Sequence, residues 1–541
     1  MRPSRYGPIA ALVMLAGCAS VPEEDGTAGR ATPTGVAAAT ADSAGAALRR
    51  GPTASDSEPA GVSSAASEPA DLWERIRRGY AIPGHDNERV RRQFEAYADD
   101  GDYWLRVSER ARPYLHHIVE QLEARGMPLE LALLPAVESA YRPFAYSHGR
   151  AAGIWQFIPA TGRHYGLEQN WWYDGRRDVV AATEAALDYL SYLNDMFEGD
   201  WLLSLAAYNA GEGTVSRAIE RNRAAGQPTD YWSLDLPAET MNYVPRLLAI
   251  SELIADPQAH DIALADLPDE PTVTLVELDR QIDLALAAEL AGIDMDTLYR
   301  LNPGYNRWAT GPDGPHRLLL PRDRAAQFRA QLARTPANAW MRWARHRIAP
   351  GETLGEIAGR YHVTVPALQQ ANDLSGDMIR AGDHLLVPVA GRPSAQYTLT
   401  ADARRERLQN REREARTRQD YVVRAGDSFW SIARRFGVNM RNLARWNGMA
   451  PGDTLAIGEQ LTVWTDAGGE PPRLASRAVP GERLQSVTYS VRKGDSLSRI
   501  ARRFNVSVAD LRRWNGLSEG VYLQPGQALR MQVDVTAQSN L

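Results

Sequence analysis

One glutamate stands among apolar residues in a way that could support acid–base chemistry. Glu138 lies within residues 133–141, a run that is otherwise mostly apolar. Burial in such surroundings disfavours a charged carboxylate, so it would raise the pKa of Glu138 and keep the group protonated near neutral pH, as a general acid requires. A glutamate in an apolar run can also be a structural partner in a salt bridge. Taken alone, the run favours that structural interpretation.

Three later segments reverse this balance. They are residues 153–157 (Gly-Ile-Trp-Gln-Phe), 206–211 (Ala-Ala-Tyr-Asn-Ala-Gly) and 239–244 (Glu-Thr-Met-Asn-Tyr-Val). They follow Glu138-Ser139 in this order and lie between stretches whose apolar residues recur at helical spacing. A Glu-Ser pair occurs by chance in most chains, so the ordered set is the informative feature.

These segments, together with Ser147, resemble the family 1 lytic transglycosylases in order and spacing. The similarity continues through residues 159–167. The chain is most similar to the D type of membrane-bound lytic murein transglycosylases, for which Ile154-Trp155 in place of Leu-Met is usual. The resemblance implies an all-α, lysozyme-like catalytic domain over residues 71–262.

The resemblance also implies a mechanism in which Glu138 acts twice. Glu138 would protonate the oxygen that links N-acetylmuramic acid to N-acetylglucosamine. As a carboxylate it would then take the proton of the C6 hydroxyl of the same muramic sugar, which closes a 1,6-anhydro ring. Because no water is consumed, the enzyme would be a lyase, and it would need neither a metal nor another cofactor.

Further residues would contact the glycan strand if the resemblance holds. Two of them have other interpretations from the residues alone: Ser139 could hold its own helix, and Glu239 could be a structural anchor at a helix start. Tyr243 would bond to Glu138 and tune it. The full set of expected substrate-binding residues is Ser139, Ser147, Gln156, Tyr208, Asn209, Glu239 and Tyr243.

Two other functions remain open on the sequence. Glycosidic hydrolysis usually uses two carboxylates, and a muramidase that lets water attack would need Asp174 or Asp178 as the second one. The second alternative is a wall-binding scaffold that has lost its activity, against which the retained Glu138 argues. Trp155, Trp171, Trp172 and Trp232 could stack on sugars or pack in the core.

The C-terminal half repeats one pattern three times, over residues 345–389, 420–464 and 488–532. Each copy has a Gly-Asp-Ser or similar loop, a short helix, a Leu-x-x-x-Asn step and a closing apolar strand. This predicts strand, helix, helix, strand, and the copies resemble the LysM domain, which binds glycans that contain N-acetylglucosamine. Repeats that serve only as spacers or as protein contacts are the alternative. A degenerate copy of the pattern, called the worn copy below, covers residues 270–322. It lacks the loop, which predicts that it packs against its neighbours and does not bind sugar.

Residues 390–419 are rich in Arg and Glu and are expected to form a charged linker or an exposed helix. Arginines in the second and third repeats could favour anionic wall polymers or could simply be solvated. These are Arg434, Arg435, Arg502, Arg503, Arg512 and Arg513.

The N-terminus resembles a bacterial lipoprotein signal. A short apolar run precedes Leu-Ala-Gly-Cys, which ends at Cys18. The run is too short for a permanent membrane span, so residues 1–18 are expected to be a signal and residues 19–70, which are poor in aromatics, a disordered tether. Lipidation of Cys18 would anchor the protein, and Ala19 favours the outer membrane, facing the periplasm of a Gram-negative bacterium. An ordinary signal peptide with an incidental cysteine is the alternative.

Composition sets the remaining bounds. A chain of 541 residues should hold several domains, here the all-α domain followed by small α+β units. Its only cysteine excludes a disulfide within the chain and a thiolate metal cluster. The net charge of −6 is mild, and no nucleic-acid partner is predicted. The expected partners are peptidoglycan strands and, through the lipid, the membrane.

Overall fold

The computed structural model describes residues 71–466, except 85, 100, 362, 414 and 415, and parts of the third repeat: residues 484–491, 495–497, 500–501, 508–517, 523–524 and 526–534. The chain divides into two compact units, of which the second holds the third repeat. Residues 1–70, with the predicted signal, Cys18 and the tether, lie outside the described residues. Within the described residues, no helix has both the length and the apolar character that crossing a membrane requires.

The first part of the chain is helical, which confirms the predicted fold class. Its elements are α1 (Leu72–Arg78), α2 (Glu88–Ala98), α3 (Gly101–Ala111), α4 (Leu115–Glu123), η1 (Leu129–Leu133), α5 (Leu134–Ser139), α6 (Pro159–His164), α7 (Val179–Met196), α8 (Trp201–Ala210), α9 (Glu212–Ala224), η2 (Tyr231–Ser233), α10 (Thr240–Ala255) and η3 (Gln258–His260).

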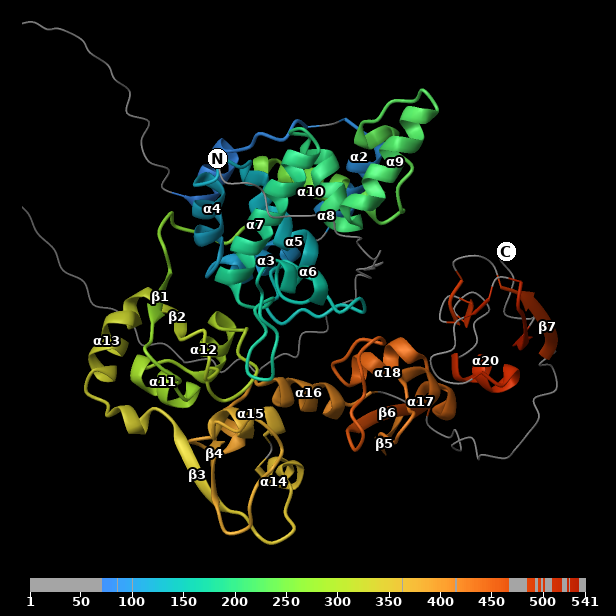
Figure 1. Ribbon diagram of the computed structural model, residues 1–541. Coiled ribbons are helices and arrows are strands. Elements are labelled where there is room, and N and C mark those ends of the chain that lie inside the picture. Colours follow the sequence, from blue (N-terminus) through green and yellow to red (C-terminus); the bar gives the residue numbers. More distant parts are fainter. Residues whose placement is uncertain are drawn as a thin grey trace, which may run out of the picture. The chain divides into compact units, whose positions relative to one another are not determined.

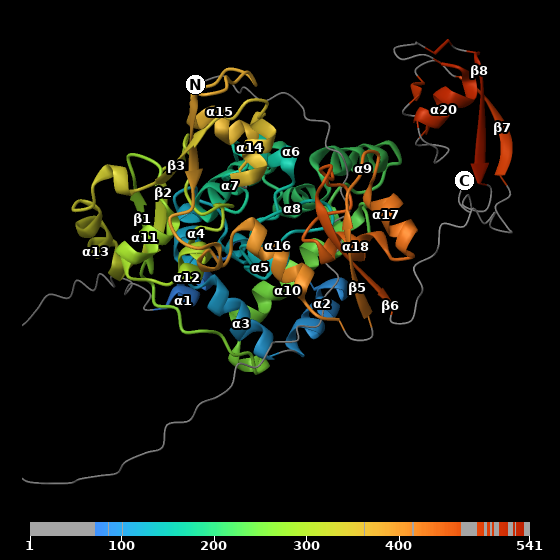
Figure 2. The same ribbon diagram turned by 90° about the horizontal axis from the view of Figure 1, so that it is seen from below.

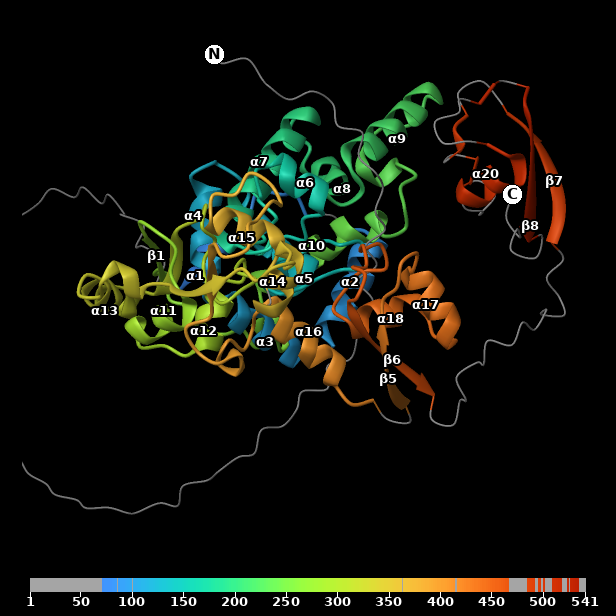
Figure 3. The same ribbon diagram turned by 60° about the horizontal axis from the view of Figure 1, so that its bottom comes forward.

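The core of this part follows from the apolar patterns. On α4, Leu115, Ile118, Val119 and Leu122 form one fully buried stripe, as their spacing predicts. Helix α8 is almost wholly apolar and packs against α7, α9 and α10, with which it forms one group (Figure 3). The side chain of Asp200 caps α8 by accepting from the second and third backbone N–H groups of the helix. Two of the segments singled out in the sequence thus lie on a central buried helix and its neighbour α10.

Each repeat folds as a strand, two helices and a strand where it is described. The strands pair in antiparallel two-stranded sheets (Figure 1). The elements are β1 (Val273–Glu277), α11 (Leu284–Ala291), α12 (Met295–Leu301), β2 (Arg317–Pro321), α13 (Arg322–Leu332) and η4 (Ala337–Ala339) in the worn copy; β3 (Arg342–Arg347), α14 (Leu354–Tyr361), α15 (Val365–Ala371) and β4 (His384–Val389) in the first repeat; β5 (Arg416–Val422), α17 (Phe429–Phe436), α18 (Met440–Trp446) and β6 (Gln460–Asp466) in the second; β7 (Leu484–Ser490), α20 (Val508–Asn515) and β8 (Ala528–Asp534) in the third.

The asparagine of the Leu-x-x-x-Asn step joins the second helix to the closing strand. In the second repeat, the Nδ2 of Asn447 donates to the carbonyls of Leu443 at 2.8 Å and Thr462 at 2.9 Å, and its Oδ1 accepts from the Thr462 N–H at 2.7 Å. The same three bonds recur at Asn302, Asn372 and Asn515. Their presence at Asn302 establishes the worn copy as a fourth unit of this kind, and Figure 2 shows β1, β2, α11, α12 and α13 as one small group.

Replacing Asn447 by Ala should destabilise the second repeat by about 3 kcal/mol, because it leaves buried strand and helix groups without partners. Asn447 is fully buried. Hydrogen exchange of the β5 and β6 amides measures the change. Asn442→Ala removes an amide that bonds only to Arg445 on the exposed face of the same helix, so its exchange should match the parent. Equal effects of the two changes would refute the role given to Asn447.

The charged stretch between the first two repeats is more ordered than a linker. Helix α16 (Ala401–Asn410) lies between the first and second repeats (Figures 1 and 3), and η5 (Ser394–Gln396) precedes it. Strand β5 begins at Arg416, earlier than the repeat pattern predicts, because its backbone pairs with the end of β6 as far as Asp466. None of the α16 residues is fully buried, as expected for an exposed helix.

Candidate active site

Glu138 lies near the end of a short helix that breaks off sharply. Helix α5 has Pro135 in its first turn and ends after Ser139. The next two residues, Ala140 and Tyr141, have φ values of 50° and 56°. Non-glycine residues rarely adopt this left-handed conformation, and they cluster where a fold holds a functional geometry. The break leaves Glu138 half-buried at the end of the helix rather than within it.

The carboxyl of Glu138 is tuned by groups on α10. The hydroxyl of Tyr243 donates to its Oε1 at 2.5 Å. Burial raises the pKa of Glu138 to about 7, the Tyr243 hydrogen bond opposes this, the neighbouring Glu239 adds to it, and the charge of Arg246 opposes it. A glutamate with a pKa near 7 is suited to giving up and regaining a proton near neutral pH.

Ser139 is half-buried and lies beside two backbone carbonyls. Its single hydroxyl hydrogen has two carbonyl acceptors within reach, that of Pro135 with Oγ at 3.1 Å and that of Ile154 with Oγ at 3.0 Å. The first contact closes the helix and the second ties it to the turn formed by residues 153–157. These contacts are compatible with the helix-holding role that the sequence left open for Ser139, and they leave the lone pairs of its oxygen for other donors.

The Gly153–Gln156 turn packs against the end of α5. Gly153 has a φ of 81° and Gln156 a φ of 49°. The side-chain amide of Gln156 donates to the Gly153 carbonyl at 2.7 Å, and the hydroxyl of Tyr208 on α8 donates to the Trp155 carbonyl at 2.9 Å. Trp155 itself is fully buried and donates to Thr183, so it belongs to the core and does not stack on sugars.

Asn209 and Ser147 each accept one hydrogen bond from a nearby group, whereas Glu239 makes no capping bond. Asn209 accepts from the hydroxyl of Thr240 at 2.8 Å, which joins α8 to the start of α10. The Oγ of Ser147 accepts from the Ala151 N–H at 3.0 Å within the loop between α5 and α6. Glu239 stands before α10, but its side chain makes no capping bond there, and burial raises its pKa. It acts on Glu138 by charge and is not a cap.

Two arginines of this region were not singled out by the sequence patterns. Arg246 lies one turn after Tyr243 on α10, so its i, i+3 spacing could have suggested it. Arg176 donates from Nη1 to the carbonyl of Arg150 at 2.7 Å and of Phe157 at 3.3 Å. It thereby holds both ends of the segment that contains Gly153, and no spacing in the sequence points to it.

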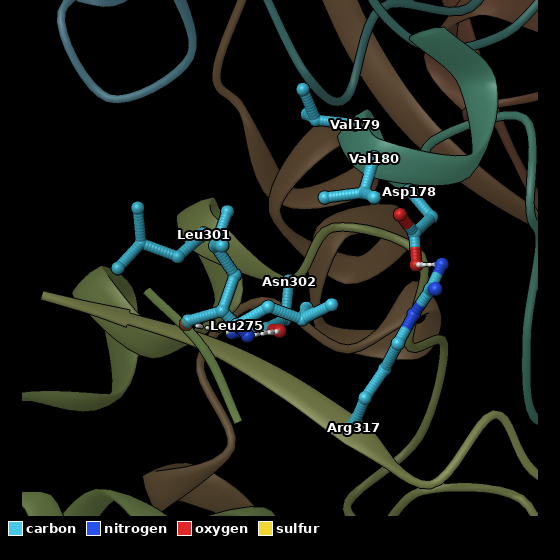
Figure 4. Close-up of a pocket in the computed structure, with 8 residues that line it drawn as sticks. Asp178, Val179, Val180, Leu275, Leu301, Asn302 and Arg317 are labelled. Carbon is cyan, nitrogen blue, oxygen red and sulfur yellow. Dashed lines mark hydrogen bonds and ion pairs between the residues drawn. The ribbon is translucent and has the colours of Figure 1, made fainter. Parts of the chain in front are cut away.

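The two aspartates that could have served a hydrolase are engaged elsewhere. Asp174 is paired with Arg176 at 2.8 Å, and both side chains are almost fully buried. Asp178 accepts from the Tyr173 hydroxyl at 2.6 Å, caps α7 and pairs with Arg317 of β2 at 3.2 Å (Figure 4). Both carboxylates are thus engaged in structural bonds with residues of the protein.

Among the residues that the structure describes, no group of three or more His, Cys, Asp or Glu could hold a metal ion.

Comparison with known families divides the chain in the same way. The pattern "Transglycosylase SLT domain" matches residues 118–230, and "Lytic transglycosylase MltD, LysM-like domain" matches residues 272–337. The pattern "LysM domain" matches residues 346–388, 421–464 and 489–532.

Individual relatives extend this similarity. The chain is 38% identical over 461 residues, 85% of either chain, to the membrane-bound lytic murein transglycosylase D of Escherichia coli. It is 33% identical over 174 residues, 32% of this chain and 22% of the relative, to an autolysin of Enterococcus faecalis. A solved structure of the lytic transglycosylase Slt from Pseudomonas aeruginosa shares 24% identity, covers 27% of this chain and 24% of its own, and has a TM-score of 0.22.

Proposed function

Because the chain belongs to the family of membrane-bound lytic murein transglycosylases D, we propose that Glu138 cuts its peptidoglycan substrate without water. The enzyme is a peptidoglycan lytic transglycosylase, a lyase, and its LysM repeats bind the same polymer. The proposed bond is the β-1,4 link from N-acetylmuramic acid to N-acetylglucosamine, and the proposed product is a 1,6-anhydro muramic end. The observation that carries this is the half-buried carboxyl of Glu138, whose pKa of about 7 suits it to act first as an acid and then as a base.

The first step is proton donation by Glu138. With a pKa of about 7, a large share of Glu138 is protonated at neutral pH. Oε1 accepts the Tyr243 hydrogen bond, so the acidic proton is assigned to Oε2. Transfer of this proton to the glycosidic oxygen lets the bond break toward an oxocarbenium-like muramic sugar, which the N-acetyl group of the substrate is positioned to stabilise.

The second step uses the carboxylate that the first step created. Tyr243 donates to it and Arg246 offers it a positive charge, so the protein stabilises the base form as well as the acid. The carboxylate takes the proton of the C6 hydroxyl, whose oxygen attacks the anomeric carbon of the same sugar. A tethered nucleophile gains the advantage of an intramolecular reaction, and Glu138 returns to its protonated state.

The residues around Glu138 are proposed to shape the sugar site. Gln156 and Tyr208 are half-exposed, and the backbone bonds of their side chains leave other lone pairs or donors for a glycan. Ser147 and Asn209 retain partial exposure in the same way, and Glu239 is proposed to contact the substrate while raising the pKa of Glu138. Ser139 is proposed to act only by holding the helix.

Membrane anchoring is proposed for the N-terminus. The name of the Escherichia coli relative supports a location in the cell envelope. The finer proposal is that Cys18 carries lipid and holds the protein at the outer membrane, facing the periplasm. Labelled palmitate should enter the parent protein and not Cys18→Ala. Label in both proteins would contradict the assignment.

The decisive assay for the proposed reaction is mass spectrometry of the glycan ends after digestion of purified peptidoglycan. Non-hydrolytic cleavage gives anhydro-muramic ends, which are lighter by one water than reducing ends. Reducing ends from the parent enzyme would establish a muramidase instead. Release of no ends at all, with binding retained, would establish the non-catalytic scaffold.

The pH dependence should follow the protonation of Glu138. Since Glu138 must start protonated, kcat/KM should fall as the pH rises through about 7.

The hydrogen bond from Tyr243 lowers the pKa of Glu138, so in Tyr243→Phe the fall in kcat/KM should move to higher pH. The maximal rate should also drop about ten-fold, because the carboxylate loses a hydrogen-bond donor. Tyr114→Phe removes a hydroxyl that bonds only to the Arg300 carbonyl and should leave the profile in place. A profile unmoved in Tyr243→Phe would contradict the assignment.

A further inference from the structure

The second LysM repeat contacts the loop that carries part of the active site. Asp453 follows α18 in that repeat, and both of its carboxylate oxygens accept from the Tyr146 hydroxyl, at 3.1 and 3.0 Å. The Nε of Arg150 lies 2.6 Å from its Oδ1 as an ion pair. Tyr146 and Arg150 stand on either side of Ser147, in the loop between α5 and α6. The contact therefore joins residues that are 307 positions apart.

The contact pairs opposite charges and is enclosed on the side of Asp453, whereas the Arg150 side chain is 42% exposed. The Asp453 side chain is 14% exposed, and its Oδ2 also accepts from the Ala450 N–H at 2.8 Å, which fixes its orientation. On the catalytic side, the guanidinium of Arg177 lies 5.8 Å from the centre of the Tyr146 ring. Removing one partner would leave the partly enclosed Asp453 carboxylate without its countercharge, so each partner helps to hold the other in place.

Arg150 connects this contact to the catalytic geometry. It has a φ of 68°, a conformation that a residue with a side chain adopts only when its surroundings hold it. Its N–H donates to the Ser147 carbonyl at 2.9 Å, and its carbonyl accepts from Arg176 at 2.7 Å. Arg176 also bonds to the carbonyl of Phe157. Hydrogen bonds thus connect the backbone of Arg150 directly to Ser147 and, through Arg176, to the turn that packs against α5.

A second contact reaches the same loop from α16. The guanidinium of Arg404 lies 4.5 Å from the centre of the Phe144 ring. Arg404 is half-buried, although none of the α16 residues is fully buried. Two elements on the C-terminal side of the first repeat therefore hold one loop of the catalytic domain, at Phe144 and at Tyr146 and Arg150.

We propose that Asp453 is a positioning residue for the lytic reaction. The second LysM repeat would then help to form the catalytic site in addition to binding the glycan. By holding Tyr146 and Arg150, it keeps Ser147 and the turn behind it in the geometry that Glu138 needs. The proposal rests on the proposed function. It predicts a loss in kcat that is separate from any loss in glycan binding.

The test is a double-mutant cycle in the full-length enzyme. Asp453→Asn keeps an oxygen for the Ala450 N–H and removes the charge that pairs with Arg150; Arg150→Met removes the other partner and leaves the sequence of the second repeat unchanged. Each change should lower kcat about ten-fold with KM little changed, and the double variant should be no worse than either single one. Asp420→Asn, which removes a charge from the exposed face of β5, is the matched control and should keep the parental kcat.

Binding to purified peptidoglycan is measured separately, in the Glu138→Gln background so that cleavage does not interfere. Asp453→Asn should bind as tightly there as the parent. The proposal is overturned if Asp453→Asn keeps the parental kcat, if its loss appears only in binding, or if the two losses multiply. Glu138→Gln in the same assays distinguishes the two failures, because an active Glu138→Gln enzyme would remove the proposed function itself.

Discussion

Glu138→Gln should lose lytic activity by several hundred-fold or more, with binding to peptidoglycan unchanged. The amide has nearly the shape of the carboxyl but cannot give a proton to the glycosidic oxygen or take one from the C6 hydroxyl. Loss of a general acid or base alone costs about 10²–10⁴-fold, and here one group performs both steps. Release of soluble muropeptides from purified peptidoglycan measures the change.

The matched control for this change is Glu239→Gln, the neighbouring carboxylate. Glu239 raises the pKa of Glu138 by charge repulsion, so neutralising it should lower that pKa. The fall in kcat/KM should then occur at lower pH, with the maximal activity within about ten-fold of the parent. Activity of Glu138→Gln within ten-fold of the parent would show that another group supplies the proton.

Gly153→Ala should be the most disruptive change in the site that leaves Glu138 in place. A Cβ on Gly153 would stand 2.0 Å from the carbonyl oxygen of Arg176, and the residue has a φ of 81°. A backbone oxygen cannot move aside as a flexible side chain can, so steric overlap adds to left-handed strain, at a combined cost of about 4 kcal/mol. We expect a marked fall in the thermal stability of the catalytic domain and activity reduced at least as far as in Tyr243→Phe.

Gly166→Ala separates the cost of left-handed backbone strain from the cost of steric overlap. Gly166 has a similar φ of 77°, and no atom lies within 4 Å of its would-be Cβ. Its substitution should cost only about 1 kcal/mol and leave the activity near that of the parent. Thermal unfolding and muropeptide release on both variants give the comparison, and similar losses in the two would mean that the Gly153 turn is not the tight junction that the structure shows.

Local patterns predicted the parts of the fold that local forces determine. The apolar stripe of α4 and the alternation of loop, helix and strand in the repeats follow from spacing, and both are present. The recurring Leu-x-x-x-Asn step indicated the worn copy even without its loop. The structure supplies the reason, since Asn302 makes the same three bonds to helix and strand as Asn447.

The direction in which a side chain points was harder to predict. Ser139 and Trp155 stand in the informative segments, yet both bond to other groups of the protein, and Trp155 is fully buried. Residue type cannot decide between a sugar contact and a backbone contact, because a hydroxyl serves either. The pairing of Asp453 with Arg150 was not predictable at all, since no periodicity joins residues on separate folded parts of the chain.

The most direct test of the central claim is digestion of peptidoglycan in water enriched in heavy oxygen. If Glu138 directs the C6 hydroxyl of the substrate onto the anomeric carbon, the new muramic ends should be anhydro and should carry no heavy oxygen. Glu138→Gln should give almost no ends of either kind. Reducing ends that carry heavy oxygen in the parent digest would mean that water is the nucleophile, and they would contradict the mechanism.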